Sequence, residues 1–217
     1  MASGGGEMAL IIVAGASGQH AAVVYEAACL AGMAVAGFAA IAGDGPDAVL
    51  DCPPLGLLDA VAGPAIADGA TFVVACGTNA LRRRVVDMLA GRGASFGNVV
   101  HPAAIVSPSA VIAGGAMLLA GAIVGPQAEL GRGTIVNHGA SVDHHCRLGD
   151  HANISPGARL GGCVTAGAGL FVGLNATILP GLRLGDDVVI GAGAVVTRDV
   201  AAGSTMVGVP ARPLRRA

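Results

Sequence analysis

A branched aliphatic residue recurs at every sixth position through the second half of the chain. Stepping by six from Val106 to Val196 meets sixteen apolar residues, of which fifteen are Val, Ile or Leu and the remaining one is Ala166. A helix has a period of 3.6 residues and a simple strand a period of 2, so neither explains this pattern. A six-residue period is typical of a parallel β-helix, in which three hexads close one triangular coil.

The repeat predicts where side chains point. The aliphatic residue of each hexad faces inward, and the residue four places later is small, as at Ala110, Ala116 and Ala122. Coils stack by parallel strand pairing about 4.8 Å apart. Residues eighteen apart in the sequence should therefore lie next to each other on successive coils.

The first half has a different pattern, that of a Rossmann-like α/β domain. Apolar runs at 7–14, 34–41 and 71–77 predict strands, and segments 21–33 and 79–93 predict helices, the second with an arginine face. Strands that alternate with helices indicate a parallel sheet covered by helices. We divide the chain into a flexible tail at 1–7, the α/β domain at 8–100, and an all-β left-handed parallel β-helix with a short C-terminal tail at 101–217.

A glycine-rich turn, "GASGQH" at 15–20, joins the first strand to the first helix. Backbone N–H groups and a helix N-terminus at such a turn can hold a phosphate, although a turn built only for packing would read the same. The second strand ends in "AAIAGD", without the acidic residue that a dinucleotide-binding domain places there. NAD binding is therefore disfavoured.

Composition and charge narrow the function classes. The chain is 53% hydrophobic but only 2% aromatic, and its formal charge of −2 gives no general attraction to nucleic acid or to an anionic membrane. The run "MALIIVAGA" is too short to span a bilayer, and we see no signal peptide. Five scattered cysteines without a CxxC pattern indicate reduced core thiols in a cytoplasmic protein.

The stretch "SVDHHCRLGD" at 141–150 contains the candidate chemistry. Val142 belongs to the inward-facing series, so His144 should point outward near a corner, level with Gly162 on the next coil. A histidine can take a proton from an attacking nucleophile, and an unobstructed backbone N–H can stabilise an oxyanion. Acyl transfer needs this pair, so His144 and Gly162 are the candidate catalytic residues.

A shared zinc ion is the rival interpretation. His138 and His144 are six residues apart, as are His145 and His151, and His144 and His145 are adjacent. Histidines on neighbouring faces of one coil do not converge easily on one ion. We therefore expect no metal.

Taken together, the repeat, the ending "GVPAR", the "GASG" turn and "VDHHCRLG" resemble one family, the hexapeptide-repeat sugar acyltransferases. Within it the resemblance is to the subfamily that acetylates nucleotide-linked amino sugars, with the related sialic acid O-acetyltransferases. The family motif has an acidic residue after the catalytic histidine, where this chain has His145. Many relatives also have an acidic pair after the second strand, which "AAIAGD" lacks.

The resemblance implies a homotrimer that uses acetyl-CoA, bound between adjacent prisms, and a nucleotide sugar, bound by the N-terminal domain. It implies His144 as the base and Gly162 as the oxyanion donor. The implied substrate contacts are Gly15, Ala16, Ser17, Gly18, Gln19, His20, Asn79, His138 and His145. The implied acetyl-CoA contacts are Asn153, Gly162, Gly173, Ala192, Arg198 and Arg212.

The function we expect is acetyl-CoA-dependent N-acetylation of a nucleotide-linked amino sugar, of the 4-amino-4,6-dideoxy class, by direct attack of the amine on the thioester. One alternative is O-acetylation of a sialic acid or similar sugar by the same fold. A second alternative is a non-catalytic trimeric module that binds sugar nucleotides.

Overall fold

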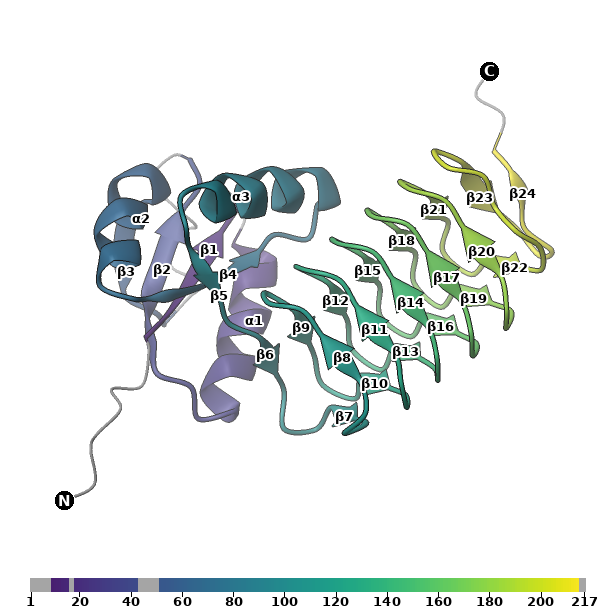
Figure 1. Cartoon of the computed structure of the whole chain (residues 1–217), viewed down its shortest axis with the longest axis horizontal. Coiled ribbons are helices and arrows are strands. Elements are labelled where there is room, and N and C mark those ends of the chain that lie inside the picture. Colours follow the sequence, from purple (N-terminus) through teal and green to yellow (C-terminus); the bar gives the residue numbers. More distant parts are fainter. Residues whose placement is uncertain (1–8, 16–17, 43–50, 215–217) are drawn as a thin grey trace.

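The computed structural model describes residues 9–15, 18–42 and 51–214 (Figure 1). A small α/β part comes first and a row of stacked coils follows. The elements of the first part are β1 (Leu10–Ala14), α1 (Gln19–Leu30), β2 (Val35–Ala40), β3 (Pro54–Leu57), α2 (Leu58–Ala67), β4 (Thr71–Ala75), α3 (Asn79–Gly91) and β5 (Ser95–Phe96). No helix in these described ranges is long and apolar enough to cross a membrane.

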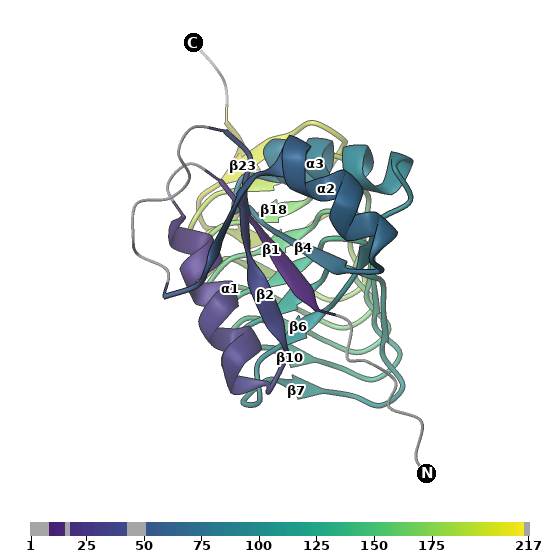
Figure 2. The ribbon, with the colours of Figure 1, turned by 90° about the vertical axis from the view of Figure 1, so that its left-hand side faces the viewer.

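The first part is a five-stranded parallel sheet with strand order β3-β2-β1-β4-β5. Successive residues of β1 point to opposite faces, so Ile12 packs with α1 while Ile11 and Val13 pack with α2 and α3. Figure 2 shows α1 on one side of the sheet and α2 and α3 on the other. The predicted helices and three strands are present, whereas α2, β3 and β5 were not predicted.

The coils are built from two-residue strands with one strand in each hexad. These are β6 (Val99–Val100), β7 (Ile105–Val106), β8 (Val111–Ile112), β9 (Met117–Leu118), β10 (Ile123–Val124), β11 (Glu129–Leu130), β12 (Ile135–Val136), β13 (Ser141–Val142), β14 (Arg147–Leu148), β15 (Asn153–Ile154), β16 (Arg159–Leu160), β17 (Thr165–Ala166), β18 (Phe171–Val172), β19 (Thr177–Ile178), β20 (Arg183–Leu184), β21 (Val189–Ile190) and β22 (Val195–Val196). The chain closes with β23 (Thr205–Val207) and β24 (Arg212–Pro213).

Three parallel sheets form the three faces of the resulting β-helix. Their orders are β22-β19-β16-β13-β10-β7, β20-β17-β14-β11-β8, and β24-β23-β21-β18-β15-β12-β9-β6, with only the last pair, β23 and β24, antiparallel. The second residue of every strand from β7 to β22 is a member of the predicted six-residue series. The predicted period therefore located all of these strands.

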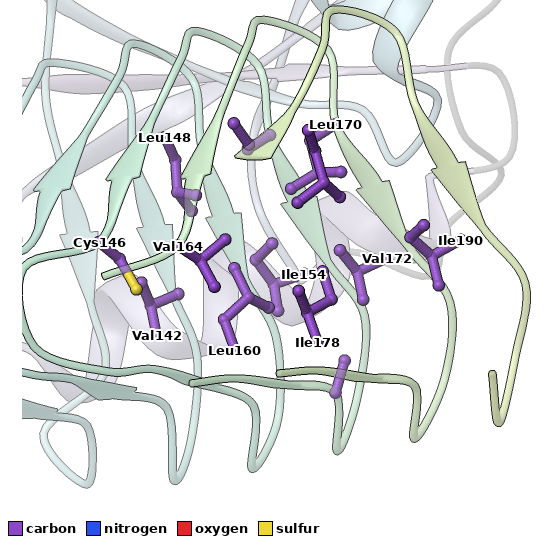
Figure 3. Close-up of a cluster of buried hydrophobic side chains, with 14 of the residues drawn as sticks. Val142, Cys146, Leu148, Ile154, Leu160, Val164, Leu170, Val172, Ile178 and Ile190 are labelled. Atoms are coloured by element: carbon purple, nitrogen blue, oxygen red, sulfur yellow. The ribbon is translucent and has the colours of Figure 1, made fainter. Parts of the chain in front are cut away.

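Aliphatic side chains fill the interior of the coils. Val142, Leu148, Ile154 and Leu160 come from successive hexads and are each at most 5% exposed (Figure 3). Removing a side chain of this size from water contributes roughly 1.5–3 kcal/mol. Repeating that contribution in every coil stabilises a domain whose strands are only two residues long.

Helix α1 of the N-terminal part packs on one face of the β-helix. Val99, Met117 and Ile135 are the outward-pointing residues of β6, β9 and β12, and all three are fully buried in a cluster with α1. Outward residues elsewhere on the coils are mostly exposed. This apolar stripe therefore seats α1 against the first coils.

Candidate active site

His144 lies at a corner of the β-helix, two residues after the buried Val142. Its side chain is exposed, as are those of Asp143 and His145. Asp143 Oδ1 accepts a hydrogen bond from the His144 backbone N–H at 2.7 Å. The His145 N–H donates to the Pro126 carbonyl on the previous coil at 2.9 Å. These two bonds hold the corner so that the imidazole rings project outward.

Gly162 lies directly against the His144 ring, as the eighteen-residue spacing predicted. β13 pairs with β16 in the register Val142↔Leu160, and a methyl group at position 162 would overlap His144 Cε1 and Nε2. The Gly162 N–H has no hydrogen-bond acceptor among the described residues. The site thus combines a ring nitrogen and a free backbone donor, as acyl transfer requires.

The two adjacent histidines are in contact. His144 Nδ1 and His145 Nδ1 are 3.0 Å apart, and the rings are nearly perpendicular with centroids 5.2 Å apart. Only one of the two nitrogens can donate in a neutral pair. If His144 Nδ1–H donates, His144 Nε2 keeps its lone pair beside Gly162. His145 can therefore fix the tautomer that a base needs, the role expected of a neighbouring acid.

Cys163 was missed by the sequence analysis. It is exposed, next to Gly162, and its N–H donates to the His144 carbonyl at 2.8 Å. Of the five cysteines expected in the core, Cys52, Cys76 and Cys146 are buried, but Cys29 and Cys163 are exposed, so the prediction was wrong for these two. The sequence could have identified Cys163, because position 163 is eighteen residues after His145 and therefore lies at the same corner on the next coil.

The "GASG" turn borders a cavity in the N-terminal sheet. Gly15, Gly18 and His20 line about 320 Å³ together with residues that follow β4. Ala16 and Ser17, two of the predicted contacts, lie outside the described residues. Gln19 is exposed at the start of α1. The cavity lies at the carboxyl ends of β1 and β4, where open parallel sheets bind ligands.

His20 is the polar group inside this cavity. Burial lowers its pKa to about 4, and the charges of Arg82 and His138 act in the same direction. The ring is therefore neutral at neutral pH, and its buried Nε2 has no partner among the described residues. An unsatisfied buried nitrogen of this kind is suited to bind a polar ligand atom.

A second cavity of about 460 Å³ lies between α3 and the coils, lined by Gly77, Thr78, Asn79, Ala80, Arg83, Gly169, Phe171, Asp187 and Val189. Asn79 Nδ2 donates to the Gly169 and Leu170 carbonyls at 3.0 and 3.2 Å. Gly77 and Thr78 also line the first cavity. Both cavities therefore meet the segment between β4 and α3, directly before the predicted contact Asn79.

Asn153 and His138 lie away from the His144 corner. Asn153 is buried on β15, where its Nδ2 donates to the Gly77 carbonyl at 2.9 Å and its Oδ1 has no partner in the described structure. The exposed His138 lines a hollow of about 230 Å³ between α1 and the coils. The chain therefore brings Asn153 to the segment that follows β4, and not to the candidate base.

The predicted acetyl-CoA contacts lie on two corners of the β-helix. Arg198 follows Val196 by two residues, as His144 follows Val142, so it lies on the His144 corner three coils further along. Gly173 and Ala192 follow β18 and β21 and lie on a different corner, where Gly173 packs against the Ala192 amide. Arg212 is exposed on β24. One chain alone does not bring these residues together.

No protein-family profile and no curated protein sequence matches the chain. Solved structures do match over nearly the full length. Perosamine N-acetyltransferase from Caulobacter crescentus, determined with CoA and GDP-perosamine, is 34% identical with a TM-score of 0.88, covering 96% of this chain and 97% of that one. The acetyltransferase domain of PglB from Neisseria gonorrhoeae, determined with acetyl coenzyme A, is 32% identical with a TM-score of 0.86, covering 96% and 100%. WeeI from Acinetobacter baumannii is 26% identical with a TM-score of 0.82, covering 94% and 100%.

Proposed function

Because the chain belongs to the hexapeptide-repeat N-acetyltransferases of nucleotide-linked amino sugars, we propose that it transfers the acetyl group of acetyl-CoA to the amine of such a sugar. The observation that carries this proposal is the full-length likeness to perosamine N-acetyltransferase bound to CoA and GDP-perosamine. The exposed His144 beside Gly162 supplies the matching chemistry.

The reaction that this corner supports is direct acyl transfer. The sugar amine attacks the thioester carbon while His144 Nε2 takes a proton from the nitrogen. The Gly162 N–H donates to the oxygen that becomes negatively charged, which is the largest electrostatic contribution expected in such a site. The tetrahedral intermediate then releases CoA thiolate, which recovers the proton from His144. The balance is one amide bond formed and one thioester bond broken.

His145 supports the base in place of an acid. In the tautomer that we propose, His145 Nδ1 accepts from His144 Nδ1–H across the 3.0 Å contact, so that Nε2 of His144 is the nitrogen that faces the reaction. When His144 becomes an imidazolium, the same hydrogen bond becomes charge-assisted and stronger. A neutral imidazole stabilises this cation less than a carboxylate does.

The nucleotide-linked sugar is assigned to the N-terminal domain, which we propose is a Rossmann-like domain at 8–100. The N-terminus of α1, which follows the "GASG" sequence, is the kind of feature that binds a phosphate. His20 can donate or accept from inside the cavity with its unpartnered Nε2. Gly15 and Gly18 line the same cavity and Asn79 lines the neighbouring one, whereas Ala16, Ser17 and Gln19 remain predicted contacts.

Acetyl-CoA is assigned to the corner of a left-handed β-helix at 101–217. Arg198 lies three coils from His144, roughly 14 Å along the stack, which suits the far, anionic end of an extended ligand. Gly173 and Ala192 reach the same ligand only from another copy of the chain, because they lie on a different corner. A homotrimer with sites between subunits fits this arrangement. Asn153, His138 and Arg212 remain predicted contacts.

The test is a transfer assay with purified protein, acetyl-CoA and a panel of GDP-, UDP- and dTDP-linked amino sugars. We expect CoA thiol release that depends on one class of amino sugar, and a product heavier by one acetyl group in mass spectrometry. Matched sugars with a hydroxyl in place of the amine form the control arm. Transfer to the hydroxyl alone would favour O-acetylation, and no transfer to any acceptor would favour a binding module.

A further inference from the structure

The corner that holds the candidate base also carries a set of soft metal ligands. His144, His145 and Cys163 are all exposed, and one ligand atom from each lies within 4.8 Å of the other two. Within the described ranges, this is the only group of three or more His, Cys, Asp or Glu residues that meets this criterion. Cys163 has no part in the transfer chemistry, so its position in the group is unexplained by the proposed function.

The distances suit a tetrahedral ion. Zinc binds histidine nitrogen at 2.0–2.1 Å and thiolate sulfur at about 2.3 Å, so two nitrogens on one ion are roughly 3.3 Å apart. His144 Nδ1 and His145 Nδ1 are already 3.0 Å apart. Two imidazoles and one thiolate are the donor set that Zn²⁺ and similar borderline ions prefer over Mg²⁺ or Ca²⁺.

Backbone hydrogen bonds fix the corner that carries the three donors. The His145 N–H is bonded to Pro126 and the Cys163 N–H to His144, each across one coil step. His145 and Cys163 have φ values of 56° and 62°, so both occupy the left-handed position of the same corner on successive coils. The adjacent Asp143 carboxylate adds negative charge to the corner. Preorganised donors reduce the ordering cost of binding.

We propose that His144, His145 and Cys163 form a site for a thiophilic divalent cation such as Zn²⁺. We also propose that the bound ion prevents His144 from acting as the base. Binding converts the Cys163 thiol to a thiolate and releases one proton. Three protein ligands leave a fourth position open to water. The ion uses a nitrogen of each histidine, which breaks the hydrogen bond between the two rings.

Inhibition follows from the identity of the bound nitrogen. A neutral imidazole that binds a metal through Nδ1 carries its proton on Nε2. If the ion binds His144 through Nε2, the lone pair of that nitrogen is taken directly. In both cases no lone pair faces Gly162, so His144 cannot accept the proton from the amine. This consequence rests on the proposed function, whereas binding of the ion does not.

Cobalt is the optical probe that tests binding. Metal-free protein, purified without a histidine tag, is titrated with Co²⁺. We expect the visible bands of tetrahedral Co²⁺ and a thiolate-to-cobalt charge-transfer band, both displaced by Zn²⁺. Cys163→Ser should remove the charge-transfer band and weaken Zn²⁺ binding at least about tenfold. Cys29→Ser, which removes the other exposed thiol in the described structure, should leave both unchanged.

Inhibition by the ion is tested with the same variants in the transfer assay. Zn²⁺ should inhibit wild type reversibly, with activity restored by a chelator, and should inhibit Cys163→Ser only at roughly tenfold higher concentration. Octahedral cobalt spectra, or a Cys163→Ser variant that binds and is inhibited like wild type, would overturn the proposed site. If the cobalt result holds but no acceptor is acetylated, the metal site stands and the proposed function fails.

Discussion

Two residues eighteen apart define the proposed chemistry, and the structure shows how little space separates them. A side chain at position 162 would overlap the His144 ring, so glycine is required there by the position of the ring and not by its own backbone angles. Sequence spacing predicted this contact because the coil period is constant. It did not predict the His144–His145 contact or the exposure of Cys163, which depend on how side chains turn at a corner.

Gly162→Ala tests the contact directly. The N–H of residue 162 remains, but the added methyl occupies the space of the His144 ring and displaces the base, and loss of a positioned general base costs about 100-fold or more in kcat. We expect a loss of that size in steady-state kinetics, with an unchanged melting temperature within a few degrees. Gly63→Ala on α2, where a methyl meets open space, is the matched control and should keep full activity. Equal activity of both variants would contradict the geometry.

His20 makes stability depend on pH. Its folded pKa of about 4 is below its ordinary value of 6.5, so the folded state favours the neutral ring. Its contribution is fully present above pH 6.5 and is lost as pH falls toward 4, by up to about 3 kcal/mol. Urea unfolding at pH 7 and pH 5, at fixed protein concentration, should show a smaller decrease for His20→Gln than for wild type. Identical decreases would exclude this role.

At the scale of elements, the buried side chain of Arg82 connects α3 to the coils. Arg82 is fully buried and donates to the carbonyls of Gly133, Cys76 and His151 at 2.7–2.8 Å, and to Asn79 Oδ1 at 2.8 Å. Burial lowers its pKa to about 10, so it stays charged at neutral pH. The guanidinium therefore ties the β4–α3 segment, which lines both cavities, to two coils.

Arg82→Ala should destabilise the protein strongly, because it leaves several buried carbonyls without a donor. Hydrogen bonds to charged groups contribute roughly 1.5–3 kcal/mol each, so we expect a loss of about 3 kcal/mol or more in urea unfolding. Arg83→Ala is the matched control one residue along. It removes only the partly exposed pair with Asp187 at 2.8 Å, which contributes at most about 1 kcal/mol. Equal losses for the two variants would refute the assignment.

The sequence predicted the strands of the β-helix more completely than the elements of the α/β part. The hexads located every strand from β7 to β22, because one buried position recurs without interruption. In the first part, α2 was missed because its sequence, "LDAVAGPAIA", contains Gly63 and Pro64 and has no clear helical period. The place of Asn153 could not be predicted either, since it depends on how the sheet docks on the coils.

At the scale of the whole molecule, the proposed acetyl-CoA site needs more than one chain. The His144 corner and the Gly173–Ala192 corner are separate in one β-helix, and both are needed in the proposed acetyl-CoA site. Apolar side chains also point outward from the face that carries His144. Ile105 and Ile123 are paired neighbours on β7 and β10 and are 66% and 39% exposed. We propose that these adjacent exposed isoleucines are part of the contact between subunits.

We therefore expect wild type to sediment at three times the chain mass of 20.9 kDa. A double variant with Ile105→Asp and Ile123→Asp should sediment as a smaller species and lose transfer activity, because charges at an apolar contact are costly to bury. Thr165→Asp, on an exposed strand of another face, is the control and should stay trimeric. A fully active monomer would contradict a site shared between subunits.

The role of His144 as the base in acetyl transfer to a sugar amine is tested by the ratio of kcat for His144→Asn to that of wild type. General-base catalysis contributes roughly 10²–10⁴-fold, so we predict a kcat at least about 100-fold lower with the preferred amino sugar. The mass in sedimentation and the melting temperature should not change. A correctly assembled His144→Asn protein that acetylates the amine within a few-fold of the wild-type rate would contradict the account.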